Sequence, residues 1–284
     1  MKNILITGAN GLLGSEFKAR LTDEEAWFCG HADLDITDFE AVRCFLKGRK
    51  IRYIINCAAC RDAEYLEDHP EQAVPVSVDG PRNLAVAAKE NGAVLIHVST
   101  DYVFDGRKSS PYLETDAVNP LNVYGVAKEQ GERAVLENAE TCLVLRTAWL
   151  FSSFGEDFVK KIRDLALKRP ELKVIFDQVG SPCYAGDFAE CVLELLPRIK
   201  PGTREIYHLT NEGVCSWYDL AYAAVKGFGL DCRVTPIHTD EFPQKALRPK
   251  YSVLDKSKIK RDFGLAIRHY SEGLSDCIRK IKGV

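Results

Sequence analysis

Two side chains one helical turn apart could together move a proton. Tyr124 and Lys128 are four positions apart in a stretch with helical periodicity, so both lie on one face of the expected helix. A tyrosine has a pKa near 10, and a cation within a few ångströms lowers that pKa by roughly 1–3 units. We therefore expect Lys128 to lower the pKa of Tyr124, so that the phenol can protonate the oxygen when hydride reaches a carbonyl carbon.

The same spacing occurs by chance on many helices, so the position of the pair in the fold matters. Thr100 directly follows residues 94–99, which predict a buried strand. Open α/β sheets bind their ligands at the carboxyl ends of the strands. Thr100 could there donate a hydrogen bond to the carbonyl oxygen that Tyr124 protonates. Thr100, Tyr124 and Lys128 are therefore the candidate catalytic residues.

A glycine triplet connects the first expected strand, residues 4–7, to the first expected helix. Gly8 permits a tight turn, Gly11 lets a pyrophosphate approach the backbone, and Gly14 lets the helix pack closely on the strand. A merely structural turn is the alternative. A strand before the glycines and a helix after them are typical of a dinucleotide site, so the sequence predicts a nicotinamide cofactor.

The second expected strand, residues 26–29, leaves the choice between NADPH and NADH open. An acidic residue at its end would bind the ribose 2′-hydroxyl of NAD, and an arginine would bind the 2′-phosphate of NADP. Gly30, His31 and Ala32 follow, and they provide neither group. Asp33 and Asp35 come next, and we expect them in the loop beyond the strand.

Apolar runs of strand length alternate with helical patterns through the first half of the chain. Strands are expected at residues 4–7, 26–29, 53–56, 94–99 and 142–147, with helices at 11–21, 38–49, 71–91 and 122–137. Thr37 and Glu40 have capping-box spacing at the second helix. Continuous Ile, Val and Leu runs indicate strands that are covered by helices on both faces. The pattern predicts an α/β fold with a doubly wound (Rossmann) parallel sheet.

The alternation loosens after residue 150. We expect residues 1–150 to form a dinucleotide-binding Rossmann domain. Residues 151–284 should form mainly a smaller C-terminal α/β lobe that binds the substrate. This lobe is expected to be non-contiguous, with some segments returning to the Rossmann domain.

The composition argues against several classes of partner. The 284 residues carry 38 Lys plus Arg and 41 Asp plus Glu, with no block of like charge. We therefore expect no binding to nucleic acid or to a membrane. The first residues lack the apolar core of a secretory signal, which predicts a cytoplasmic protein with ten reduced cysteines. The histidines do not cluster with acids, so no metal site is expected.

The sequence resembles the extended short-chain dehydrogenase/reductases and, among them, the dTDP-4-dehydrorhamnose reductase family. The resemblance spans nearly the whole chain. It rests on residues 8–14, 34–38, 56–59, 99–106, 119–125, 128, 146–149, 177–182, 248–249 and 252. Ser-Thr-Asp-Tyr-Val-Phe at 99–104 and Asp-Gln-Val-Gly-Ser-Pro at 177–182 are far more specific than the glycines.

The resemblance implies reduction of the 4-keto group of dTDP-4-dehydro-β-L-rhamnose to dTDP-L-rhamnose by NADPH or NADH. The residues that would line the cofactor are Gly8, Asn10, Gly11, Leu12, Leu13, Gly14, Asp35, Ile36, Cys57, Ala58, Ala59, Tyr124 and Lys128. The dTDP-sugar would meet Thr100, Asp101, Tyr102, Trp149 and Arg248. Arg248 is our candidate cation for the diphosphate, with a solvated surface arginine as the alternative. Family members are often homodimers.

The chain departs from the family pattern beside the expected site. Residues 60–64 read Cys-Arg-Asp-Ala-Glu where the family usually has Tyr-Thr-x-Val-Asp, Ser77 replaces an asparagine, and Cys183 replaces a threonine. The exact sugar therefore stays open. Two other functions also stay open. One is a non-catalytic, dinucleotide-binding regulatory subunit resembling the methionine adenosyltransferase β-subunit, and the other is a nucleotide-sugar epimerase or dehydratase that holds its NAD tightly.

Overall fold

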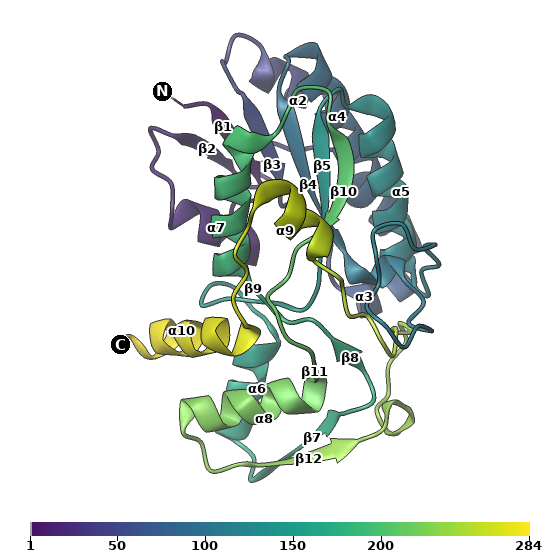
Figure 1. Cartoon of the computed structure of the whole chain (residues 1–284), viewed down its shortest axis with the longest axis vertical. Coiled ribbons are helices and arrows are strands. Elements are labelled where there is room, and N and C mark those ends of the chain that lie inside the picture. Colours follow the sequence, from purple (N-terminus) through teal and green to yellow (C-terminus); the bar gives the residue numbers. More distant parts are fainter. Residues whose placement is uncertain (1) are drawn as a thin grey trace.

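A six-stranded parallel sheet forms the centre of the computed structural model, which describes residues 2–284 (Figure 1). The strands lie in the order β10-β5-β4-β3-β1-β2. Their bounds are β1 (Ile4–Thr7), β2 (Ala26–Cys29), β3 (Tyr53–Asn56), β4 (Val94–Thr100), β5 (Cys142–Thr147) and β10 (Arg204–His208). The predicted doubly wound parallel sheet is confirmed. The strand order reverses at β1, between β2 and β3, and such a switch point leaves a crevice at the carboxyl ends of the strands.

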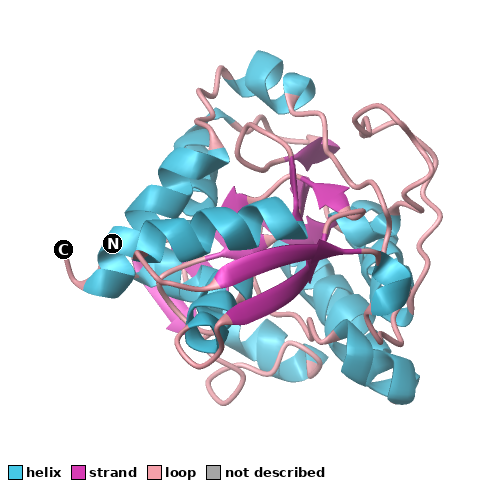
Figure 2. Cartoon of the chain, turned by 90° about the horizontal axis from the view of Figure 1, so that it is seen from below, coloured by secondary structure: helices cyan, strands magenta, loops and turns pink. Residues whose placement is uncertain are grey.

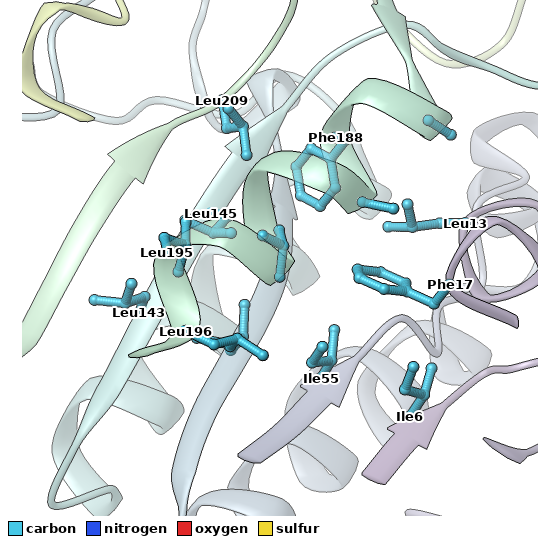
Figure 3. Packing of buried hydrophobic residues seen from close by; sticks show 14 of the residues in the cluster. Ile6, Leu13, Phe17, Ile55, Leu143, Leu145, Phe188, Leu195, Leu196 and Leu209 are labelled. Carbon is cyan, nitrogen blue, oxygen red and sulfur yellow. The ribbon is translucent and has the colours of Figure 1, made fainter. Parts of the chain in front are cut away.

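Helices cover both faces of this sheet. The helices of the described chain are α1 (Leu12–Lys18), α2 (Phe39–Leu46), α3 (Ala63–Asp68), α4 (Gly80–Glu90), α5 (Val123–Asn138), α6 (Phe158–Ala166), α7 (Ala185–Leu195), α8 (Trp217–Phe228), α9 (Ser257–Phe263) and α10 (Tyr270–Lys282). Of these, α6, α8 and α10 lie away from the sheet. Successive side chains of a strand point to opposite faces. Ile6 of β1 therefore packs with Phe17 of α1 and Phe188 of α7 (Figure 3). Its neighbour Leu5 packs in the other layer with Leu84 of α4.

The later part of the chain builds a second, smaller body below the sheet in Figure 1. Its short strands are β6 (Leu150–Phe151), β7 (Glu171–Ile175), β8 (Val179–Gly180), β9 (Cys183–Tyr184), β11 (Cys215–Ser216) and β12 (Arg233–Ile237). β7 pairs with β12, and these two strands lie in front when the molecule is seen from below (Figure 2). Val159 of α6, Leu220 of α8 and Leu274 of α10 share its core.

The chain returns to the central sheet after it has entered this smaller body. β10 pairs with β5 at the sheet edge, and α7 and α9 contribute Leu195 and Phe263 to the core beneath the sheet. The division near residue 150 therefore stays a prediction about domains, whereas the central sheet itself draws on residues from both halves of the chain.

Two local predictions need correction. Residues 71–91, expected as one regular helix, are helical almost throughout, but a 3₁₀ turn (Pro70–Gln72) and a π-helical turn (Pro75–Asp79) precede α4, and α3 is a separate helix before them. Asp62 begins α3 by accepting a hydrogen bond from the Tyr65 N–H (3.0 Å), and Pro75 has no N–H with which to continue a regular helix. The cap of α2 is Asp38, because its carboxylate accepts the Ala41 N–H (3.0 Å).

Three further properties concern the part of the chain that the structure describes. Within residues 2–284, no helix is both long and apolar enough to cross a membrane. All ten cysteines have free thiols. Nowhere in the same range do three or more His, Cys, Asp or Glu side chains gather in a way that could hold a metal ion.

Candidate active site

The glycine loop packs tightly on one side and is open on the other. A Cβ atom on Gly8 would lie 2.6 Å from the Ala58 nitrogen, and one on Gly14 would lie 2.4 Å from the Gly8 oxygen. A Cβ atom on Gly11 would meet only the Gly8 oxygen, at 3.2 Å. No side chain caps α1, so the N–H groups of its first turn are available to an anion. This cradle fits the pyrophosphate of a dinucleotide.

The end of β2 places an acidic side chain beside the glycine loop. The Gly30 N–H donates to Asp33 Oδ2 (2.8 Å), and a Cβ atom on Gly30 would collide with the Asn10 amide at 2.2 Å. Both Asp33 and Asp35 lie beyond the strand, as predicted. Asp35 accepts the N–H (2.9 Å) and hydroxyl (2.8 Å) of Thr37, and these bonds lower the pKa of Asp35. Its carboxylate is thus already engaged in a local turn.

Two other predicted cofactor residues are partly occupied by internal packing. The Ile36 side chain is buried, and a Cβ atom on Gly80 would lie 2.5 Å from it, so Ile36 has only its backbone to offer a ligand. Burial raises the pKa of the Cys57 thiol, which keeps this cysteine protonated at neutral pH. Ala58, next in the chain, lies directly against the glycine loop.

The carboxyl end of β4 and the start of α5 bring Thr100 and Tyr124 together. Asn122 caps α5 by accepting the Gly125 N–H (2.8 Å), and its amide also donates to the Leu247 carbonyl (2.7 Å). Tyr124 therefore lies on the first turn of α5. Burial raises the pKa of Tyr124 to about 12, although a hydrogen bond with Thr100 acts in the opposite direction. The prediction of a Tyr124 pKa below the usual value is wrong, because burial outweighs the other effects.

Lys128 lies one turn further along α5 and is 2% exposed. Its ammonium donates to the Val98 carbonyl (2.6 Å) and lies 3.4 Å from His97 Nε2. Burial lowers the pKa of Lys128 to about 8, while the nearby Glu132 carboxylate opposes this shift. Lys128 can therefore exchange a proton close to neutral pH.

A buried carboxylate adjoins these hydroxyl groups. Asp101 is 2% exposed, and its Oδ1 accepts the Thr100 hydroxyl (3.1 Å). Its Oδ2 has no hydrogen-bond partner in the structure. Burial raises the pKa of Asp101 to about 7. The Tyr102 ring meets the Tyr124 ring edge to face at 5.9 Å between centroids. The unpartnered oxygen makes this corner suitable for a polar ligand.

Trp149 has a strained backbone conformation. Its φ is +47°, and within residues 2–284 no other non-glycine residue has a positive φ. Such a conformation costs about 1–3 kcal/mol and is concentrated at ligand sites. The indole stacks on Trp217 with 3.6 Å between ring centroids, and a Cβ atom on Gly180 would lie 2.6 Å from it. The glycine of the 177–182 string therefore makes room for Trp149.

Arg248 lies at the rim of the site and is already paired. Its Nη2 donates to Glu64 Oε1 (3.1 Å), and its side chain is 29% exposed. Its charge acts to lower the pKa of Tyr102, although burial raises that pKa overall. Glu64 also accepts the backbone N–H of Lys245 (2.7 Å), so the loop that carries Arg248 is attached to α3.

Sequence reasoning missed the buried polar groups that support the site from below. Glu132 binds Arg146 through two hydrogen bonds (2.9 and 2.7 Å) and accepts the Ser99 hydroxyl (2.5 Å). His97 contacts Lys128. Both His97 and Arg146 occur inside apolar runs of predicted buried strands, and a polar residue in such a run must find an internal partner. The sequence therefore shows that His97 and Arg146 need internal partners, but it does not show which residues those partners are.

Known proteins match the chain over nearly its whole length. The family described as "RmlD substrate binding domain" matches residues 1–282. A dTDP-4-dehydrorhamnose reductase of Aggregatibacter actinomycetemcomitans is 38% identical over 97% of this chain and 98% of the relative. A dTDP-4-keto-6-deoxy-D-glucose reductase of Streptomyces niveus is 36% identical over 95% of this chain and 94% of the relative.

A solved structure has the same fold with a cofactor bound. The dTDP-4-dehydrorhamnose reductase of Bacillus anthracis in complex with NADP has a TM-score of 0.94 and 34% identity, and the match covers 99% of this chain and 100% of that one. The predicted resemblance is therefore confirmed by both sequence and structure. The chain belongs to the RmlD substrate binding domain family of dTDP-sugar reductases.

Proposed function

We propose that the protein uses NADPH or NADH to reduce the 4-keto group of a dTDP-linked deoxysugar, converting dTDP-4-dehydro-β-L-rhamnose to dTDP-L-rhamnose. The observation that carries this proposal is the position of Thr100, Tyr124 and Lys128 at the carboxyl end of β4, the same end of the parallel sheet at which the glycine loop follows β1. The names and shared length of the relatives support the same reaction.

The bound nicotinamide supplies the hydride, and the side chains of this chain supply the proton and the orientation. Tyr124 has a raised pKa, so its phenol is protonated at neutral pH and can donate to the ketone oxygen as negative charge develops there. The Thr100 hydroxyl would turn its single proton from Asp101 Oδ1 to the same oxygen. Lys128, with a pKa of about 8, would then supply the proton that restores Tyr124. Its amine is bonded to the Val98 carbonyl and faces His97, so this transfer would run through a bridging water or ligand hydroxyl.

We propose that the remaining predicted residues contact the dTDP-sugar. Asp101 would accept a sugar hydroxyl with its unpartnered Oδ2. Trp149 and Tyr102 would pack against the sugar and the base, and Arg248 would turn from Glu64 to the diphosphate. We further propose that the protein acts in the cytoplasm as a homodimer, as the resemblance implies.

Oxidation of the cofactor tests the proposed function. Purified protein with dTDP-4-dehydrorhamnose should consume NADPH or NADH, which is seen as loss of absorbance in the near ultraviolet. Tyr124→Phe should lower kcat by about 10²–10⁴-fold, because the variant keeps the ring but loses the proton donor. Leu113→Ala, which shortens an exposed side chain, is the control and should match the wild type.

The same assay with dTDP-4-keto-6-deoxy-D-glucose distinguishes two possible sugars, since one relative is named for that substrate. Turnover of this sugar alone would replace the rhamnose assignment. If neither sugar were reduced with either cofactor, the proposed reaction would be wrong.

A further inference from the structure

A chain of buried hydrogen bonds runs beneath the active site and reaches Lys128 through three residues to which the proposed reaction gives no role. It starts at Thr7 of β1, continues through Asn56 of β3 and His97 of β4, and reaches Lys128 of α5. Thr7 Oγ1 lies 2.7 Å from Asn56 Oδ1, Asn56 Nδ2 lies 3.1 Å from His97 Nδ1, and His97 Nε2 lies 3.4 Å from Lys128 Nζ. All four residues are at most 2% exposed, so these polar groups depend on one another for partners.

A backbone donor fixes the direction of this chain. The Ala58 N–H donates to Asn56 Oδ1 (3.1 Å), and a backbone N–H has no ability to accept. Asn56 Oδ1 is therefore the acceptor, and its Nδ2 is the donor that faces His97. His97 Nδ1 must then be unprotonated. A neutral imidazole in this position carries its proton on Nε2, which is the nitrogen that faces Lys128.

The surroundings of His97 keep it neutral. Among the described residues 2–284, the charged group that shifts its pKa is Lys128 of α5. Asn56 of β3 and Val144, the register partner of His97 on β5, are uncharged. Burial and the Lys128 charge both lower the pKa of His97 well below its usual value. A doubly protonated imidazole would also lose the hydrogen bond from Asn56.

Lys128 is faced by a small number of groups. His97 and the Val98 carbonyl approach it from β4, Glu132 from its own helix, and the Cys57 thiol from the loop after β3. Glu132 favours the charged amine, but its carboxylate is already bound to Arg146 and Ser99. His97 is therefore the neighbour whose proton position matters most to the amine.

We propose that His97 is a positioning residue for the reduction: as the Nε2–H tautomer it holds the Lys128 amine beside the Val98 carbonyl and favours the uncharged form of that amine. An N–H that faces an ammonium opposes its charge, whereas the same N–H donates readily to a neutral amine. His97 therefore helps Lys128 to release a proton to Tyr124 near the working pH. The part of this inference that concerns turnover rests on the proposed function.

The position of the imidazole proton tests the inference without any turnover. Protein labelled with nitrogen-15 histidine should give long-range proton–nitrogen correlations in which His97 carries its proton on Nε2 and has a bare Nδ1. His97 should stay neutral from about pH 8 down to about pH 5. A proton on Nδ1, or charging of the ring in this range, would overturn the inference.

The second test follows kcat/KM against pH, because that ratio reports the free protein. Activity of the wild type should fall above about pH 8 as Lys128 loses its charge. In His97→Phe this fall should move to higher pH by about half a unit to one unit, since the opposing N–H is gone. If kcat/KM of His97→Phe fell at the same pH as that of the wild type, the inference would be contradicted.

His208→Phe is the matched control, because His208 is also 0% exposed and packs against Phe104 rather than Lys128. Its pH profile should coincide with that of the wild type. If His97→Phe does not fold, the tautomer measurement on the native protein still decides. A wild type that reduces no keto sugar would refute the proposed function and leave the tautomer result intact.

Discussion

Several residues at the proposed site lower the stability of the folded protein. Asp101 and Lys128 are both buried with their pKa values moved toward the neutral form, and Trp149 holds a left-handed backbone. Each of these features costs folding free energy that a simpler residue would not cost. Their concentration around the carboxyl ends of the neighbouring strands β4 and β5 is the pattern expected of a site selected for chemistry rather than for stability.

The loss of folding free energy that comes from burying Asp101 depends on pH. Its pKa is about 7 in the folded protein and about 3.9 in an unfolded chain, so between these values the folded state binds more protons. Stability should therefore fall as pH rises through that window. Asp101→Asn should remove this loss and be more stable than the wild type at about pH 8, by up to roughly 4 kcal/mol. At about pH 4 the advantage should vanish.

Urea unfolding at both pH values measures this effect, and the free energy of unfolding is the quantity compared. Asp105→Asn is a control, because Asp105 is more exposed and its pKa is lowered rather than raised. An Asp101→Asn difference that is equal at both pH values would mean that the buried carboxyl is not the source.

The catalytic candidates followed from residue type and position in the sequence, but their chemical environment did not. Thr100, Tyr124 and Lys128 were identified by spacing and by the strand that precedes them. The direction of the Tyr124 pKa shift depends on burial, which no spacing reports. His97 lies 31 positions from Lys128, so their contact appears only when β4 and α5 are placed together.

At the scale of elements, α5 is attached to the sheet through charge as well as through apolar packing. Glu132 and Arg146 of β5 are each 3% exposed and form a two-bond pair. Lys128 is one turn before Glu132 on the same helix, and Tyr124 is one turn earlier still. The pair therefore sets the depth at which both candidate catalytic side chains meet the end of β4.

Removing one partner of the Glu132–Arg146 pair should strongly destabilise the protein. Glu132→Leu leaves the Arg146 charge buried and unpaired, and we expect a loss of about 3–5 kcal/mol in the free energy of unfolding. The double variant Glu132→Leu with Arg146→Met should recover most of that loss, because no buried charge remains. Denaturant unfolding of the wild type, of Glu132→Leu, of Arg146→Met and of the double variant measures the coupling energy between the two side chains. Equal losses in the single and double variants would show that the ion pair is not responsible.

The strands were predictable because each of them is marked in the sequence by a continuous run of apolar residues. β1, β2, β3 and β5 have the predicted bounds, since continuous apolar runs end where polar or glycine residues begin. Residues 71–91 also have helical periodicity, yet Pro75 and the π-helical turn interrupt them. The reason is tertiary, because a Cβ atom on Gly131 of α5 would lie 2.0 Å from the Ser77 oxygen, so this turn is shaped by its contact with α5.

At the scale of the whole molecule, the two bodies are joined by more than one passage of the chain. The sheet receives β10, α7 and α9 from the second half of the sequence. Leu195, Leu209 and Phe263 share a core with Ile6 and Phe17. Residues 1–150 therefore contain all of the proposed cofactor contacts but not the whole core that holds them.

A fragment of residues 1–150 should consequently fail to fold. It would lack the edge strand β10 and leave Phe17 and its neighbours without α7. We expect near-ultraviolet circular dichroism without tertiary signal, no cooperative thermal transition and rapid proteolysis. The full-length chain is the control. A cooperative transition in the fragment would show that the first half is an independent domain.

The late position of α9 in the sequence also affects how the protein is made. At about 5–20 residues per second, synthesis from Ile6 to α9 takes on the order of a quarter of a minute to a minute. During that time Ile6 and Phe17 have no helix α9 in the same core, because residues 257–263 are made long after them. The order in which these elements are synthesised therefore differs from the order in which they can be buried, and α1 and β1 must wait for a distant part of the chain before their core is complete.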